Sequence, residues 1–241
     1  MSRKKRVSSA NKTEKTENKK TNQKKDEPKR RAVLPKRVVI SAKNDSQKIA
    51  LKMMKEKDIV MITGIAGSGK SFLASSWALN EVIKGTYKNI IITRPCVEAN
   101  GENLGFLPGD FNEKIAPYMI PIFSCFGKYM TQAQLQKLMD DKIVTTLPLA
   151  YMRGVTFENT VVIADEMQNT IPEQVRMLLT RKGPNSKVIL NGDLNQSDIK
   201  SKNGLADACE RLQDIDEIGI VHLEIPVRDP IITKIEERYK K

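Results

Sequence analysis

The segment 64–71 constrains the fold of this chain more than any other part of its 241 residues. It reads G-I-A-G-S-G-K-S and fits the phosphate-loop (P-loop) pattern G-x-x-x-x-G-K-[S/T] at every fixed position. The apolar run 58–63 before it predicts a buried strand, and the run 72–83 after it predicts a helix. A glycine loop between a strand and a helix indicates a nucleotide-binding α/β sheet.

The loop carries its own chemistry. Glycines let backbone N–H groups turn inward around phosphate oxygens, and the following helix adds the partial positive charge of its N-terminus. Lys70 is expected to reach the terminal phosphates, and the Ser71 hydroxyl to bind Mg²⁺. The alternative is a glycine-rich turn that binds nothing, and the two flanks argue against it. The residues expected to bind the nucleotide are Gly64, Ile65, Ala66, Gly67, Ser68, Gly69, Lys70 and Ser71.

Two acids follow a second apolar run. The segment 161–164 predicts a strand, and Asp165 and Glu166 come directly after it. In P-loop ATPases an acid at this place binds Mg²⁺, and a second acid activates the attacking water. We therefore expect Asp165 to hold the metal and Glu166 to act on water. A pair of acids that only caps a helix is the alternative.

Three further polar residues are candidates. Asp193 and Gln196 follow the predicted strand 187–190, where side chains of a parallel sheet face the ligand crevice. Gln196 is expected to sense the γ-phosphate or hold the water, with Asp193 in support; a turn without a ligand is the alternative. Gln47 lies shortly before the P-loop strand, and its amide matches the donor and acceptor of adenine. Alone, it would indicate only a polar turn.

Strand-like runs alternate with helical runs. Strands are predicted at 59–63, 89–93, 143–146, 160–164, 187–190 and 218–223, and helices at 71–84, 131–140, 172–181, 204–212 and after Asp229. This order favours an α/β fold: a P-loop NTPase (RecA-like) parallel sheet with helices on both faces. The stretch 94–130 is expected to be a long functional excursion. His222 lies in an apolar run and is interpreted as a strand residue.

The charge is concentrated at the N-terminus. Residues 1–37 hold 15 basic and four acidic side chains out of totals of 41 and 29, so they carry +11 of the net charge of +12. We expect this segment to be a disordered basic tail and 38–241 to be the ATPase domain. The tail would bind nucleic acid through phosphates, or serve only solubility.

The cysteines and the apolar runs indicate the cellular compartment of the protein. Three widely spaced cysteines suit reduced thiols, and no run is long enough for a membrane span or has the form of a signal peptide. A cytoplasmic protein without a membrane partner is expected.

Several blocks in order resemble the PhoH-like family of P-loop ATPases, which is related to the core of superfamily-one helicases. The blocks are T-R-P at 93–95, L-G-F-L-P-G-D at 104–110, P-Y at 117–118, A-Y-M-R-G-V-T-F at 150–157, D-E-M-Q-N at 165–169, L-T-R at 179–181, G-D-x-x-Q at 192–196 and V-R-D-P at 227–230. The sequence departs from the family pattern at Asn100, an extra residue, and at Met167, where a small residue is usual. The short chain suggests a minimal member of the kind that phage genomes carry, without the ribonuclease-type domain of some relatives.

The resemblance implies Mg²⁺-dependent ATP hydrolysis acting on, or regulated by, single-stranded RNA or DNA. A nucleotide-gated binding protein with little turnover and a P-loop kinase for a small substrate are the alternatives. One such domain lacks the second lobe of a helicase, so a homo-oligomer is expected, and a hexameric ring is one form it could take. Arg228 matches the helicase-like arginine motif, and Arg228 or Arg181 would reach a neighbour's γ-phosphate.

Overall fold

The computed structural model describes residues 34, 35, 37–95, 111–199 and 201–239. The predicted tail therefore lies almost wholly outside the described residues. So do Asn100, the block 104–110, and Cys96; Cys125 and Cys209 are free thiols.

Six parallel strands form one sheet in the order β3-β2-β4-β5-β1-β6. The strands are β1 (Ile59–Gly64), β2 (Asn89–Thr93), β3 (Val144–Thr146), β4 (Thr160–Ala164), β5 (Lys187–Gly192) and β6 (Ile218–Leu223). Every residue of β4 and β5 is buried, as expected for central strands that are covered on both faces. The prediction of a parallel α/β sheet is confirmed.

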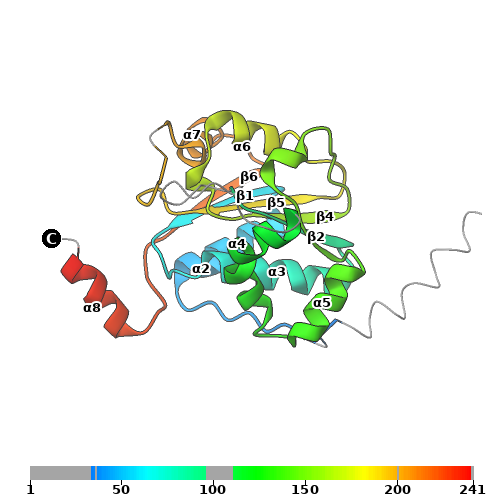
Figure 1. The fold of residues 1–241 in the computed structure, drawn as a ribbon. Coiled ribbons are helices and arrows are strands. Elements are labelled where there is room, and N and C mark those ends of the chain that lie inside the picture. Colours follow the sequence, from blue (N-terminus) through cyan, green and yellow to red (C-terminus); the bar gives the residue numbers. More distant parts are fainter. Residues whose placement is uncertain (1–33, 36, 96–110, 200, 240–241) are drawn as a thin grey trace, which may run out of the picture. The chain divides into compact units, whose positions relative to one another are not determined.

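Helices cover both faces of the sheet (Figure 1). On one side lie α2 (Asp45–Glu56), α3 (Lys70–Lys84), α4 (Phe111–Phe126) and α5 (Gln132–Asp140), and on the other α6 (Pro172–Leu179) and α7 (Gly204–Arg211). The short 3₁₀ helices are η3 (Leu149–Met152) and η4 (Met167–Asn169), and α8 (Pro230–Tyr239) follows β6. Among the described helices, none is both long and apolar enough to cross a bilayer.

Local signals account for several helix ends. The Asn44 side chain accepts a hydrogen bond from the backbone of Gln47 at the start of α2, and a capping box at Thr131 begins α5. Pro172 occupies the first turn of α6, and Gly85 ends α3 in the left-handed conformation. Each device satisfies backbone groups or sets a backbone angle at the point where the helix begins or ends.

Two of the described α-helices were not predicted from the sequence. The helix α2 includes Gln47, whose surroundings alone indicated only a polar turn, and α4 lies in the stretch read as an excursion. The helix α4 contains Pro117 and Pro121, which argue against a helix in sequence. Its Met119, Ile122 and Phe126 are nevertheless fully buried and recur on one face. The burial of that face outweighs the loss of backbone hydrogen bonds at the prolines.

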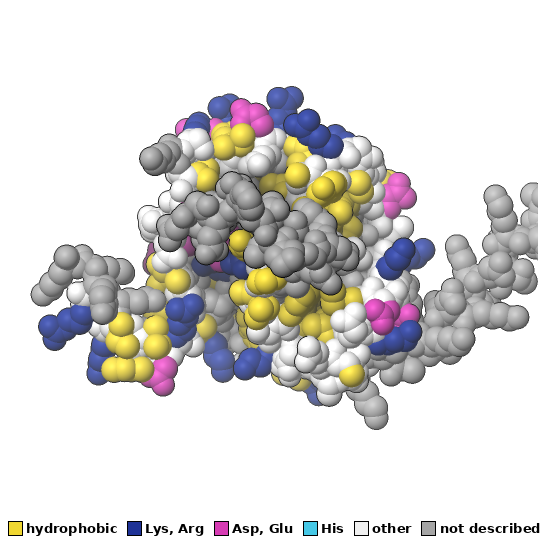
Figure 2. Space-filling model, viewed as in Figure 1, with side chains coloured by type: hydrophobic (Ala, Val, Ile, Leu, Met, Phe, Trp, Pro, Cys, Tyr) yellow, Lys and Arg dark blue, Asp and Glu magenta, His cyan; other side chains and the backbone are white. Residues whose placement is uncertain are grey.

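The core beneath α6 and α7 is apolar. Met61, Val162 and Leu190 of three central strands meet Val175 and Leu205 of the two helices. Met167 belongs to the same cluster and is fully buried, so the unusual residue after the acid pair is a core residue. Figure 2 shows basic and acidic side chains scattered over this face, and hydrophobic side chains both near its centre and on α8, where Ile231 and Ile235 are exposed.

Candidate functional site

The P-loop connects β1 to α3 at the carboxyl edge of the sheet. Lys70 begins α3, and its Nζ donates to the carbonyl oxygens of Gly64 (2.7 Å) and Ile65 (2.9 Å). Gly67 and Gly69 have φ values of +76° and +91°, which favour glycine. The lysine is thus folded into a loop whose shape depends on glycine.

A close approach explains Gly64. A Cβ atom at this position would lie 2.2 Å from the carbonyl oxygen of Leu223 at the end of β6. The N–H of Ile65 donates to that same oxygen at 3.3 Å. The start of the P-loop is therefore held against the last strand of the sheet.

Gln47 supports the loop from α2. Its Nε2 donates to the Ser68 carbonyl at 2.8 Å, its Oε1 accepts from the Lys43 N–H at 2.7 Å, and the side chain is buried. Both ends of the amide are thus engaged with protein backbone. The expected contact with adenine stays a prediction, and in this structure Gln47 fixes the shape of the P-loop.

The candidate metal ligands lie together. The Ser71 hydroxyl donates to Asp165 Oδ1 at 2.7 Å, and Asn191 Nδ2 donates to the same oxygen at 3.4 Å. Burial is the main cause that raises the pKa of Asp165, and the Ser71 hydrogen bond opposes it. Two buried oxygens, Thr93 Oγ1 at the end of β2 and Asn191 Oδ1 on β5, have no hydrogen-bond partner. Hard oxygen atoms from two strands and from α3 thus surround Asp165.

Lys70 lies in the field of three carboxylates. Burial lowers its pKa, whereas Asp193, Glu166 and Asp165 act in the opposite direction. Asp193 is itself buried, at the end of β5. The three acids favour the charged form of Lys70 against its burial, and its ammonium group can exchange the two backbone carbonyls for phosphate oxygens.

Glu166 differs from Asp165 in its backbone conformation and in its hydrogen-bond partners. Its backbone is left-handed, with φ +56° and ψ +36°, which is uncommon for a residue other than glycine. Arg94 Nη2 donates to Oε1 at 2.8 Å, and Gln168 Nε2 donates to Oε2 at 2.7 Å. Both oxygens of the expected base are therefore held by protein groups.

Gln168 connects that carboxylate to β5. Its Oε1 accepts from the Asp193 N–H at 3.2 Å. A Cβ atom at Gly192 would lie 2.7 Å from this Oε1, so glycine permits the approach. Gln196 follows on the same loop, where its N–H donates to the Asp193 carbonyl, and the residue is exposed. Its expected role at the γ-phosphate stays a prediction.

The two candidate arginines lie at different places. A Cβ atom at Gly67 would meet Arg228 Cδ and Nε at 2.4 Å, and the Val227 N–H donates to the Gly67 carbonyl at 2.9 Å. Arg228 therefore lies against the P-loop of its own chain, and the expectation that it reaches a neighbour's γ-phosphate stays a prediction. Arg181 follows α6, at the amino edge of the sheet, where its carbonyl accepts from Phe157.

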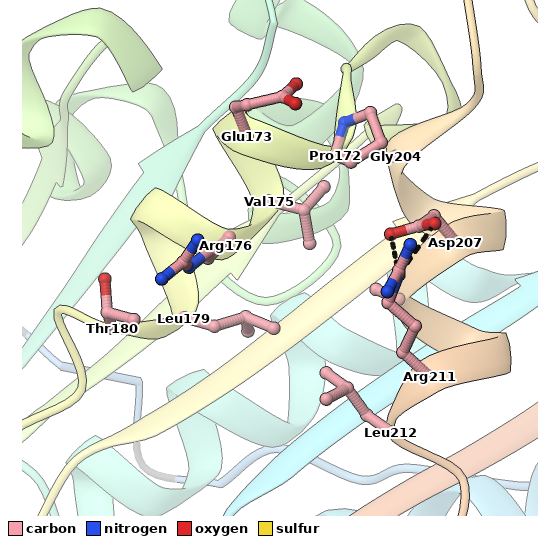
Figure 3. A pocket seen from close by; sticks show the side chains of 11 residues that line it. Pro172, Glu173, Val175, Arg176, Leu179, Thr180, Gly204, Asp207, Arg211 and Leu212 are labelled. Carbon is pink, nitrogen blue, oxygen red and sulfur yellow. Dashed lines mark hydrogen bonds and ion pairs between the residues drawn. The ribbon is translucent and has the colours of Figure 1, made fainter.

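A separate cavity of about 560 Å³ lies between α6 and α7 (Figure 3). Val175, Leu179 and Leu212 line it, and Asp207 at its rim pairs with Arg211. It contains none of the predicted site residues. His222, as expected, is a strand residue, and its Nδ1 lies 2.8 Å from the Thr63 hydroxyl.

Sequence reasoning did not assign roles to Arg94, Gln168 and Asn191. The first two lie within the T-R-P and D-E-M-Q-N blocks, and Asn191 precedes the G-D-x-x-Q block. Each follows or ends a strand that leads to the site. Their position just after, or at the end of, a predicted strand was the sequence signal that could have identified them as site residues.

Comparisons with known proteins agree with this architecture. The family model "PhoH-like protein" matches residues 39–240. The chain is 44% identical over 206 residues to the PhoH-like protein of Bacillus subtilis, covering 84% of this chain and 64% of that one. It is 42% identical over 186 residues to Protein PhoH of Escherichia coli, covering 76% and 52%. The chain thus spans between half and two thirds of these relatives.

Solved structures are more distant. The Pif1 helicase from Candida albicans aligns with a TM-score of 0.44 and 15% identity, over 83% of this chain and 44% of that chain. The family match and the curated relatives carry the assignment, and they agree with the P-loop, the acid pair and the parallel sheet. The chain belongs to the PhoH-like protein family.

Proposed function

We propose that the chain is an Mg²⁺-dependent ATPase whose activity is coupled to single-stranded RNA or DNA. The observation that carries this proposal is the partly buried hydrogen bond between Ser71 and Asp165 beside Lys70. It joins the first turn of α3 to the end of β4, so that two hard ligands and a cation converge on the P-loop. Such convergence is what binding of a triphosphate with its metal requires.

The donor set fits Mg²⁺. This ion prefers oxygen ligands, and it is usually held by one or two protein groups together with phosphates and waters. Ser71 and Asp165 would be the protein ligands, and the unpartnered oxygens of Thr93 and Asn191 offer acceptors to its waters. When bound, Mg²⁺ would neutralise charge on the phosphates.

The chain's other groups have separate tasks in this proposal. Lys70 leaves the carbonyls of Gly64 and Ile65 and binds the terminal phosphates. Glu166 accepts the proton of the attacking water, and Gln196 orients that water. Arg228, which already lies beside Gly67, neutralises negative charge as it develops on the phosphates.

The alternative of a nucleotide-gated binding protein with little turnover has one observation in its favour. Arg94 and Gln168 hold both oxygens of Glu166, so the carboxylate can bind a water in their place only after one of these hydrogen bonds is released. Under that alternative, ATP would bind and change the affinity for nucleic acid, but hydrolysis would stay slow even with RNA or DNA present.

Phosphate release from ATP, measured without any acceptor molecule, tests the proposal. We expect Mg²⁺-dependent release that changes when single-stranded RNA or DNA is added, and loss of release in Lys70→Ala. The control is Lys52→Ala on the exposed face of α2. Binding of ATP without release under every condition would select the nucleotide-gated alternative, and transfer to a small acceptor alone would select a kinase.

The basic segment 1–37 is proposed to add non-specific affinity for nucleic acid. Each lysine or arginine that contacts a phosphate releases counterions, so binding should weaken steeply with salt. Deletion of residues 1–31 should lower the affinity and flatten the salt dependence. An unchanged salt dependence would leave the tail with a role in solubility only.

A homo-oligomer, with a hexameric ring as one form, is proposed as the active state. Since Arg228 lies at its own P-loop, a mixture of Lys70→Ala and Arg228→Ala proteins should recover no activity. The same mixture with Arg181→Ala should recover activity if Arg181 completes a neighbour's site. Sedimentation with and without ATP would test the assembly itself.

A further inference from the structure

Arg94 connects two parts of the molecule through one guanidinium group. Its Nη2 donates to Glu166 Oε1 at 2.8 Å, and its Nη1 donates to the Tyr118 carbonyl of α4 at 2.6 Å. The arginine side chain is 17% exposed, so these are partly desolvated, charge-assisted hydrogen bonds. A shift of α4 therefore acts directly on the group that holds Glu166.

Glu166 has little freedom to absorb such a shift. Gln168 holds its second oxygen, and Gln168 is itself buried and tied to the Asp193 backbone. The left-handed backbone of Glu166 further limits the direction of its side chain. The carboxylate thus has two defined attachments: Gln168 connects it to the backbone that follows β5, and Arg94 connects it to α4.

One turn of α4 is weaker than the rest of the helix. Pro117 and Pro121 remove backbone N–H groups on either side of Tyr118, which weakens the helical ladder at the turn that Arg94 contacts. Beyond that turn, buried Ile122 and Phe126 anchor the helix, which packs on α3, the helix that begins at the P-loop. A displacement at the proline-containing turn is therefore less costly than one at the anchored end.

We propose that Arg94 is a positioning residue that couples the position of α4 to the orientation of Glu166. This inference rests on the proposed role of Glu166 in activating water. When Arg94 follows the Tyr118 carbonyl, it withdraws from Oε1, and the carboxylate turns from its resting partners toward the water at the γ-phosphate. The ATP site and α4 then respond to each other in both directions.

This double contact requires the planar guanidinium group of an arginine. A lysine at position 94 keeps the positive charge beside Glu166, but a single ammonium lacks the planar, two-armed geometry that reaches Glu166 and Tyr118 together. Arg94→Lys therefore keeps the ion pair with Glu166 but loses the simultaneous hydrogen bond to the Tyr118 carbonyl, whereas Arg94→Ala loses both contacts.

Two measurements test the coupling. Hydrogen exchange of the α4 amides is followed with and without Mg²⁺ and a non-hydrolysable ATP analogue, and single-turnover hydrolysis is measured in parallel. In the wild type the analogue should change exchange at 118–126, and both Arg94→Ala and Arg94→Lys should lose that change. Hydrolysis should fall by about 10²-fold in Arg94→Ala, because a misplaced catalytic group costs that much, and Arg94→Lys should recover part of the loss.

Arg176→Ala, on an exposed position of α6, is the control and should leave both measurements unchanged. Binding of the analogue should be equal in all variants, which separates misplacement of Glu166 from damage to the P-loop. An α4 response that persists in Arg94→Lys, or wild-type hydrolysis in Arg94→Ala, would overturn the proposal. If the wild type hydrolyses no ATP, the proposed function fails, but the exchange comparison still tests the link.

Discussion

Asp165 and Glu166 are adjacent in sequence and lie in opposite environments. Asp165 is 2% exposed and accepts from Ser71 and Asn191, all within the layer of central strands and α3. The Glu166 side chain is 39% exposed, and its partner Arg94 reaches out to α4. The comparison teaches that the expected metal ligand lies in the buried centre of the sheet, whereas the expected base is held by a residue that also contacts a helix outside the sheet.

The largest effect should come from exchanging the two acids for their amides. Glu166→Gln should bind Mg²⁺ and ATP as well as the wild type, but hydrolyse ATP about 10²–10⁴-fold more slowly, because the positioned base is lost. Asp165→Asn should instead raise the Mg²⁺ concentration required for binding. Nucleotide titrations at several Mg²⁺ concentrations, together with phosphate release, check both.

Equal hydrolysis in Glu166→Gln and the wild type would remove Glu166 from the chemistry. A loss of nucleotide binding in that variant would remove the distinction between the two acids.

A smaller effect should follow from crowding the P-loop. Gly67→Ala places a methyl group 2.4 Å from Arg228 and strains a φ of +76°, so nucleotide affinity should fall by about tenfold, the equivalent of about 1.4 kcal/mol. Gly154 has a similar φ of +78° but nothing within 4 Å of an added Cβ. Gly154→Ala is therefore the matched control, with a cost in stability only, and equal affinities in the two variants would contradict the contact with Arg228.

Gln47→Ala should test the support of the P-loop from α2. It leaves the Ser68 carbonyl and the Lys43 N–H without their partner, and the free energy of unfolding should fall by about 1–3 kcal/mol. Gln136→Ala removes an exposed hydrogen bond on α5 and should cost much less. Denaturant unfolding measures both, and equal losses would show that Gln47 is not a structural support.

Far from the site, stability should depend on pH. Lys187 begins β5, is buried beside Trp77, and burial lowers its pKa to about 8 from 10.5. The folded state therefore loses this proton before the unfolded state does, and the free energy of unfolding should rise between about pH 8 and 10.5. Lys187→Met should remove that rise, whereas Lys52→Met should retain it.

The sequence predicted the strands and the P-loop better than the surroundings of Glu166. Apolar runs identified all six strands, because buried parallel strands carry few polar residues. The P-loop pattern located Lys70 and Ser71, and the acids that follow β4 located Asp165. These features depend on local composition or on a fixed spacing.

The hydrogen bonds around Glu166 depend instead on distant residues. Arg94 precedes it by 72 positions, and α4 is a helix in spite of two prolines. The adjacency of β2 and β4 brings Arg94 to the acid, and only the strand order reveals this. The support that Gln47 gives to the P-loop likewise depends on a residue distant in sequence, the Ser68 carbonyl, so the sequence indicates only an amide suited to adenine.

The contact between Gly64 and Leu223 has a consequence for how the site assembles during synthesis. The strand β1 pairs with β5 and β6, which begin at residues 187 and 218, so its two neighbours leave the ribosome long after it does. Contacts between such distant segments form slowly. The P-loop therefore reaches its final surroundings late, and a nascent chain that stops before β6 would lack the strand that contacts Gly64.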